Sequence, residues 1–214
     1  PRELEVHRVR VDGAHVLELG PHLNPLPFNG STTTPDPHVW FDMERMAAAA
    51  ELIGSTLADT TAHSDYRECG QQVADRIRAA DTQVSAVLES VPEGKRVLIT
   101  DHDAFGYLAA RYGYRIAGSV VPSSSTLAEP SSADLAALAA EVRRQGVPAI
   151  FSNVGQPGAL ASAVASEAGT HVTVVPLYVE SLGAPGTSAD SYIGMMMYDA
   201  TAIADALNQT GDSP

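Results

Sequence analysis

The 214-residue sequence contains a single cysteine, Cys69, which excludes a disulfide framework and a zinc site built from thiolates. Positive charge is also scarce, because 13 Lys and Arg stand against 26 Asp and Glu, giving a formal net charge of −13. Nucleic acid is therefore not expected as a partner, since phosphate binding requires clustered Lys and Arg. No apolar run reaches the roughly 18 residues of a membrane-spanning helix.

Aromatic residues make up 6% of the chain, whereas hydrophobic residues as a whole make up 44% and charged residues 18%. Disordered chains combine low hydrophobicity with high charge, so this composition indicates a folded protein. Alanine is abundant, which favours helices packed on a buried sheet in one or two domains. Nothing at Pro1 resembles a signal peptide and no initiator Met is present, which we interpret as a processed or truncated product.

The first part of the chain is expected to be irregular and then helical. One or two short strands are expected within Glu5–Leu19, followed by a loop from Gly20 to Pro37 that is rich in Pro, Gly, Ser and Thr. Apolar spacing predicts a helix over Asp42–Leu57 and a longer one over Ser64–Ser90, about 40 Å long and suited to join two lobes. The apolar stripe of the longer helix is expected to contain Val73, Ile77, Val84 and Leu88.

The remainder of the chain alternates between short apolar runs and helical patterns. Strands are expected at Arg96–Thr100, Arg115–Val121, Ala149–Ser152 and His171–Leu177. Helices are expected at Ala104–Tyr112, Ser131–Gln145, Pro157–Ala168 and Ser191–Leu207. This alternation predicts the α/β class, with a parallel sheet and helices on both of its faces.

Three residues are candidate metal ligands. His102 and Glu180 each follow a predicted strand, so both are expected at the carboxyl edge of the sheet, where open α/β sheets bind ligands. His38 lies in a loop before a helix, and Asp36 or Asp42 is placed to orient its ring. Imidazole and carboxylate are standard zinc ligands, although a lone histidine is more often a surface residue. Among the other histidines, His22 alone lies near enough in sequence to His38 to be an additional ligand.

Other motifs are weak or missing. The sequence contains no phosphate-binding glycine loop, no nucleophile-elbow pattern and no His-Glu-x-x-His helix of a zinc protease. Met195, Met196 and Met197 follow one another within a predicted helix, and core packing is a better interpretation of them than a copper site.

Four stretches, in order, resemble the zinc- and manganese-binding solute-binding proteins of bacterial ABC transporters. They are Asp36-Pro-His-Val-Trp-Phe-Asp42, Asp101-His-Asp-Ala-Phe-Gly-Tyr107, Ala128-Glu-Pro-Ser-Ser-Ala-Asp-Leu135, and Leu177-Tyr-Val-Glu-Ser-Leu-Gly183 with Ala189-Asp-Ser-Tyr-Ile-Gly-Met-Met196. The resemblance covers about Val6 to Leu207. It implies two α/β lobes joined by a long helix, with residues 1–62 as a remnant of the first lobe, 63–92 as the linker helix and 93–214 as the second lobe.

In this family the metal is bound in the cleft, so the resemblance implies His38, His102 and Glu180 as ligands. A histidine at position 102 resembles zinc-type members, whereas manganese-type members carry glutamate there. Two departures stand out: the family usually has aspartate at position 180, and a further ligand histidine lies upstream in strands that this chain does not contain. Water or another side chain is therefore expected in the fourth zinc position.

The resemblance implies metal capture and not catalysis, with zinc as the first choice and manganese as the alternative. The expected partner is the membrane permease of an ABC transporter, and the expected location is extracytoplasmic, in the periplasm or lipid-anchored at the cell surface. Two alternatives remain at this point. Three ligands with an open position also describe a zinc-dependent hydrolase, and an incomplete first lobe is compatible with a surface adhesin that carries a vestigial metal site.

Overall fold

The computed structural model describes residues 16–28, 31, 33–121, 131–154, 158–169 and 172–209. Most of the strand prediction for Glu5–Leu19 lies outside these residues, and its described part, residues 16–19, forms no strand. The predicted loop contains a short 3-10 helix, η1 (Gly20–Leu23), and an isolated bridge between Pro27 and Pro35. A second 3-10 helix, η3 (Val39–Phe41), leads into the first long helix.

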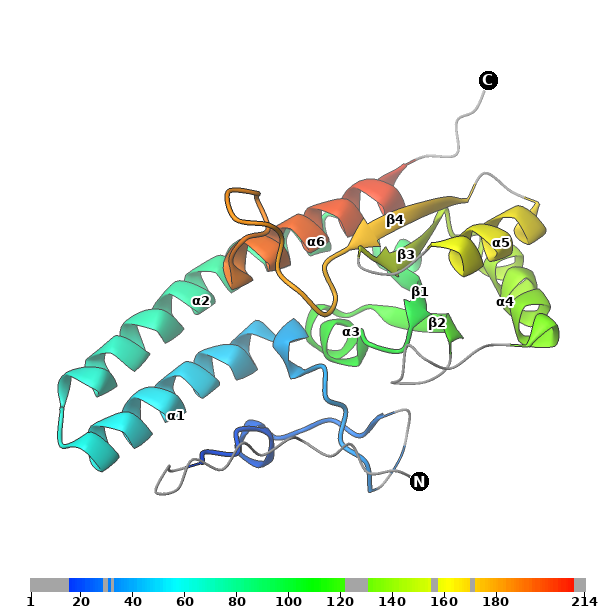
Figure 1. The fold of residues 1–214 in the computed structure, drawn as a ribbon. Helices are drawn as coiled ribbons and strands as arrows, with labels where there is room; N and C mark the ends of the chain where they lie inside the picture. The colour runs from blue at the N-terminus through cyan, green and yellow to red at the C-terminus, as the bar shows by residue number, and fades with distance from the viewer. Residues whose placement is uncertain are drawn as a thin grey trace.

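Two long helices form an antiparallel hairpin that extends from one end of the molecule (Figure 1). They are α1 (Met43–Thr61) and α2 (Asp65–Glu89), so both predicted helices are confirmed. The side chain of Asp42 caps α1 by accepting hydrogen bonds from the backbone N–H groups of Glu44 and Arg45.

The two helices of the hairpin approach closely where Gly54 faces Gly70. A Cβ atom added at Gly54 would lie 2.8 Å from the Cα atom of Gly70, so the contact requires glycine. This packing buries part of the predicted stripe of α2, including Ile77, but leaves Val73 45% exposed. The prediction for Val73 was wrong because the glycine contact, and not the apolar spacing alone, sets which side of α2 faces α1.

A four-stranded sheet lies at the other end of the hairpin. Its strands are β1 (Val97–His102), β2 (Arg115–Val121), β3 (Ala149–Asn153) and β4 (Thr173–Leu177). All neighbouring strands pair in parallel, in the order β2-β1-β3-β4. The connecting and final helices are α3 (Gly106–Tyr112), α4 (Ser132–Gln145), α5 (Ala159–Ala168) and α6 (Tyr192–Asn208).

Helices cover both faces of the sheet, as Figure 1 shows. Successive side chains of β1 point to opposite faces, so Leu98 packs in one cluster and Ile99 in the other. The first cluster joins the sheet to α2, α3 and α6, and the second joins it to α4 and α5. The predicted α/β class with a parallel sheet and flanking helices is confirmed.

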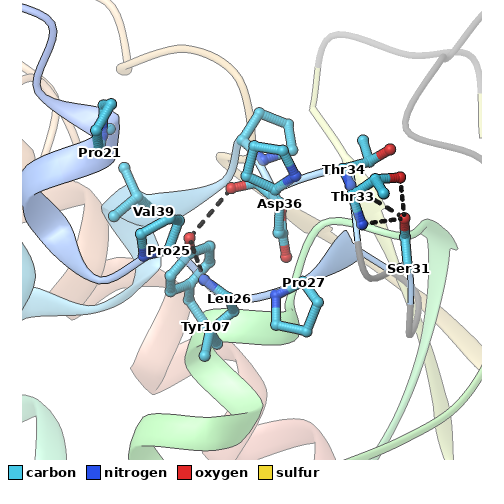
Figure 2. A pocket seen from close by; sticks show the side chains of 13 residues that line it. Pro21, Pro25, Leu26, Pro27, Ser31, Thr33, Thr34, Asp36, Val39 and Tyr107 are labelled. Carbon is cyan, nitrogen blue, oxygen red and sulfur yellow. Dashed lines mark hydrogen bonds between the residues drawn. The ribbon is translucent and has the colours of Figure 1, made fainter.

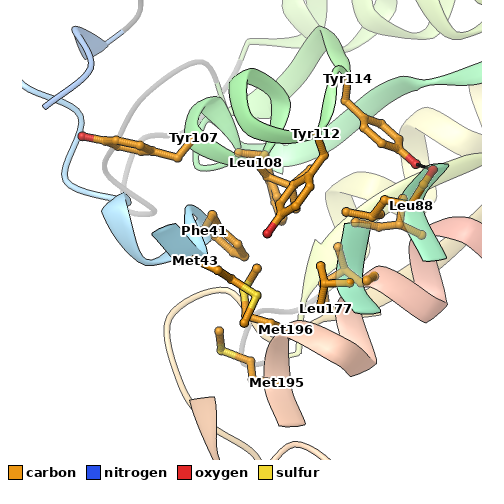
Figure 3. Packing of buried hydrophobic residues seen from close by; sticks show 14 of the residues in the cluster. Phe41, Met43, Leu88, Tyr107, Leu108, Tyr112, Tyr114, Leu177, Met195 and Met196 are labelled. Atoms are coloured by element: carbon orange, nitrogen blue, oxygen red, sulfur yellow. Dashed lines mark hydrogen bonds between the residues drawn. The ribbon is translucent and has the colours of Figure 1, made fainter. Parts of the chain in front are cut away.

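The larger cluster also connects the hairpin to the sheet (Figure 3). Phe41, the last residue of η3, and Met43, the first residue of α1, are both fully buried against it. Met195 and Met196 of α6 are 4% and 1% exposed in the same cluster, so their interpretation as core residues is confirmed. The start of α1, and with it the preceding loop that carries His38, is therefore fixed against the sheet.

The parallel arrangement brings the carboxyl ends of the strands to one edge. β1 ends at His102, β3 ends at Asn153, and the segment after β4 contains Glu180. Among the described residues, no helix has the length and apolar character needed to span a membrane. The division into a first-lobe remnant, a linker helix and a second lobe remains a prediction.

Candidate metal centre

His102 closes β1 and is 2% exposed. Its ring Nδ1 lies 2.8 Å from Oδ1 of Asp101, which also accepts the backbone N–H of His102. In the neutral ring, with a carboxylate as acceptor, Nδ1 carries the proton and Nε2 carries the lone pair. That Nε2 atom is buried and has no hydrogen-bond partner among the described residues. Oε1 of Glu180 lies 3.7 Å from it.

The surroundings of His102 act on its pKa in opposite directions. Burial lowers the pKa, but the hydrogen bond and the charge of Asp101, with the charges of Glu180 and Asp103, raise it. The net result is a pKa above the ordinary value of 6.5. The carboxylates around this imidazole therefore favour its protonated, positively charged form.

His38 is held in a comparable way on the other side of the site. It is 3% exposed, and its Nδ1 lies 2.7 Å from Oδ1 of Asp36, which also accepts the backbone N–H of His38. Asp36 therefore orients this ring, and Asp42, the other candidate from the sequence, instead caps α1. The hydroxyl of Tyr107 donates to the carbonyl of Asp36 and accepts the N–H of Leu26, which fixes the loop (Figure 2).

The two imidazole rings lie next to each other in a T-shaped arrangement, with centroids 5.9 Å apart. Two imidazoles on one tetrahedral zinc ion would have centroids about 5 Å apart, given the usual Zn–N distance. The ring of Trp40 lies 5.4 Å from that of His38, and its Nε1 donates to the carbonyl of Val179. This bond connects the loop of His38 to the segment that carries Glu180.

Glu180 reaches the site from the surface, with its side chain 42% exposed. Its two carboxylate oxygens have different neighbours: Oε1 faces His102, and Oε2 accepts a hydrogen bond of 3.3 Å from Nδ2 of Asn153. Asn153 closes β3 and was not identified from the sequence. Its backbone N–H also donates to Oδ2 of Asp101, at 2.6 Å.

The three predicted ligands thus lie near one another, but their side chains do not surround a common metal position. Within the described ranges, no three His, Cys, Asp or Glu side chains converge closely enough to hold a metal ion. His22 and His63 are exposed, and the remaining histidines, which are His7, His15 and His171, lie outside the described residues. The structure therefore brings together His38, His102 and Glu180, and ligation would require their side chains to move inward.

Asp103 is a further acidic residue beside the site. Its pKa is raised by burial first and then by the charge of Asp36, while His38 and His102 partly offset both effects. Asp36 and Asp103 both line a cavity of about 760 Å³ between the sheet edge and α4. Asp36 also lines a cavity of about 640 Å³ formed with Tyr107 and the proline-rich loop (Figure 2).

A family profile described as zinc-uptake complex component A, periplasmic, matches residues 3–206. The chain belongs to this family. The resemblance seen in the four sequence motifs is thereby confirmed.

The relatives of this chain include proteins named for binding zinc and for binding manganese. The zinc-binding protein TroA of Treponema pallidum is 32% identical over 181 residues, which are 80% of this chain and 57% of the relative. The manganese-binding lipoprotein MntA of Bacillus subtilis is 28% identical over 184 residues, which are 83% of this chain and 60% of the relative. The chain therefore spans less than two thirds of the length of either relative.

Solved structures show the same fold. The periplasmic zinc-binding protein TroA from Treponema pallidum superposes with a TM-score of 0.77 at 30% identity, over 87% of this chain and 68% of that one. A manganese-bound periplasmic metal-binding protein from Candidatus Liberibacter asiaticus gives a TM-score of 0.76 at 23% identity, over 90% of this chain and 71% of that one. At that lower identity the likeness concerns the fold alone.

Proposed function

We propose that this chain captures a transition metal ion outside the cytoplasm and delivers it to the permease of an ABC transporter. His38, His102 and Glu180 are the proposed ligands, and the ion is cargo that is bound and released. Zinc is the first choice and manganese the alternative. Membership of the zinc-uptake family, and relatives named for zinc and for manganese, support this function.

The observation that carries the proposal is the pairing of His102 with Glu180. An unpaired lone pair on a buried nitrogen costs roughly 1–3 kcal/mol, and here it faces a carboxylate oxygen 3.7 Å away. A cation between the two atoms would satisfy both. In a tetrahedral zinc site with ordinary Zn–N and Zn–O distances, two ligand atoms lie about 3.4 Å apart. The observed separation is close to that value.

His38 is proposed as the third ligand because its orientation matches that of His102. In both residues a carboxylate holds the proton on Nδ1, which leaves Nε2 free of that proton for a metal. Bringing the ring centroids from 5.9 Å to about 5 Å requires only a small side-chain movement. Water is proposed in the fourth position.

The donor set favours zinc. Two imidazoles and one carboxylate suit zinc, whereas manganese prefers more oxygen ligands. Capture is proposed in preference to catalysis because the family and the named relatives are proteins of metal uptake or metal binding. The extracytoplasmic location is supported by the periplasmic character of the family and by MntA of Bacillus subtilis, which is a lipoprotein.

Isothermal titration with zinc at neutral pH tests this function on the full chain, His102→Ala and the control His63→Ala. The unmodified chain should bind one zinc ion. His102→Ala should weaken binding by more than about 100-fold, since loss of a ligand exceeds the usual effect of losing its hydrogen-bond partner. His63→Ala should bind zinc as tightly as the unmodified chain, because His63 is exposed and is not a proposed ligand. Equal binding by all three proteins would contradict the proposed site.

A further inference from the structure

Asn153 occupies a position between two of the proposed ligands. It closes β3, which lies between β1, carrying His102, and β4, which precedes Glu180. The side chain of Asn153 is well shielded, since the residue is 4% exposed. Its Nδ2 atom donates to Oε2 of Glu180 at 3.3 Å, while its backbone N–H donates to Oδ2 of Asp101 at 2.6 Å.

The contact with Asn153 makes the two oxygens of Glu180 unequal. A glutamate with 42% of its side chain exposed has several rotamers available, and a buried neighbour is needed to select one. Asn153 contacts Oε2, and the same arrangement leaves Oε1 directed at Nε2 of His102. The amide thus selects which oxygen faces the imidazole.

We propose that Asn153 is a positioning residue that holds Glu180 as a one-oxygen metal ligand and thereby favours zinc over manganese. This inference rests on the proposed function. It concerns the side chain alone, because the backbone N–H of Asn153 holds Asp101 whichever side chain is present.

The selectivity follows from coordination number. Zinc in protein sites is usually four-coordinate, so two imidazoles, one carboxylate oxygen and one water complete its shell. Manganese favours six ligands and more oxygen. The hydrogen bond from Asn153 favours the orientation in which Glu180 presents Oε1 to Nε2 of His102, and a single oxygen suits the smaller shell.

Two variants separate this role from a structural one. Asn153→Ala removes the donor and frees Oε2 to ligate. Asn153→Asp keeps the shape, loses the donor and adds an oxygen ligand beside Glu180. Ser152→Ala is the matched control, since the adjacent hydroxyl donates to Asp101, at 3.4 Å, and not to Glu180. If Asn153→Ala melts below the assay temperature, Asn153→Ser takes its place.

The experiment measures zinc and manganese affinities of the full chain by chelator competition, together with zinc K-edge absorption of each protein. The ratio of zinc to manganese affinity should fall about tenfold in both Asn153 variants and stay unchanged in Ser152→Ala. The number of oxygen neighbours of zinc should rise in the variants.

The inference would be overturned if both Asn153 variants kept the zinc-to-manganese affinity ratio and the number of oxygen neighbours of the unmodified chain. The same holds if the variants differed from the unmodified chain only by a lower melting temperature. Zinc binding by the unmodified chain that still requires His102 would then leave the proposed function intact. Absence of zinc binding by the unmodified chain would overturn both.

Discussion

His38 and His102 present the same chemistry to the site but are held by different parts of the fold. Each ring has a carboxylate on Nδ1, at 2.7 Å from Asp36 and 2.8 Å from Asp101. His102 lies in a strand, and its carboxylate Asp101 is bound to the neighbouring strand β3 through the backbone of Asn153. His38 lies in a loop outside the sheet.

The segment of His38 is instead fixed by three side-chain hydrogen bonds that connect it to distant elements. Tyr107 of α3 donates to the carbonyl of Asp36, Tyr192 of α6 donates to the carbonyl of Trp40, and Trp40 donates to the carbonyl of Val179. The position of His102 therefore depends on strand pairing, whereas the position of His38 depends on individual hydrogen bonds. We therefore expect movements that admit or release metal to occur at His38 and Glu180, while His102 stays fixed.

Asp101→Ala should have the largest effect, because Asp101 supports both the ligand and the sheet. Zinc affinity should fall about 10–100-fold, as expected when the carboxylate partner of a ligating histidine is lost. The free energy of unfolding should fall by about 3 kcal/mol, since backbone N–H groups of two strands lose their acceptor. Zinc titration and urea unfolding measure the two effects, and Asp101→Asn is the control that keeps the shape of the side chain.

Asp36→Ala should cause a similar loss of zinc affinity, about 10–100-fold, with a smaller loss of stability of about 1–2 kcal/mol. Asp36 orients His38 and accepts its backbone N–H, but it pairs no strands. The same titration and unfolding measurements apply. If Asp36→Ala destabilised the protein as much as Asp101→Ala, the contrast between loop and sheet would be wrong.

The pH dependence of stability tests how the segment before Glu180 is anchored. Asp199 of α6 is 1% exposed and accepts the backbone N–H of Tyr178. Burial raises its pKa from 3.8 to about 8, although the Tyr178 N–H opposes this shift. Between about pH 4 and pH 8 the folded state therefore holds a proton that the unfolded state has lost. The contribution of Asp199 to the free energy of unfolding therefore falls as the pH rises through this window, by up to about 1.4 kcal/mol per pH unit.

Asp199→Asn removes this titration and should flatten the dependence. Urea unfolding of the unmodified chain and the variant at pH 5 and pH 7.5 gives the comparison. The unmodified chain should lose more stability between these pH values than the variant does. Equal losses in the two proteins would show that Asp199 is ionised in the folded state throughout this range.

Much of the site was predictable because parallel strands share an edge. The apolar runs predicted the end of β4 correctly, at Leu177, but ended β1 at Thr100, whereas the strand continues to His102. The shared edge of parallel strands still brought His102 and Glu180 together. Asn153 was not identified because the sequence does not give strand order, and its role depends on β3 lying between β1 and β4. Asp101 was not identified as the partner of His102 because consecutive strand residues normally point to opposite faces.

The orientation of His38 was predicted as a choice between Asp36 and Asp42. The sequence leaves both options open, because each carboxylate lies within a few residues of the ring. The start of α1 decides between them: Asp42 is used as its cap, and Asp36 is left for the imidazole. The exposure of Val73 was not predictable from apolar spacing because it depends on the contact between Gly54 and Gly70.

Anomalous diffraction at the zinc absorption edge, from crystals of the full chain grown with one equivalent of zinc, tests the central claim most directly. The account predicts a single peak within about 2.3 Å of Nε2 of His38, Nε2 of His102 and Oε1 of Glu180. A peak at the exposed His22 or His63, with no density between His102 and Glu180, would contradict it.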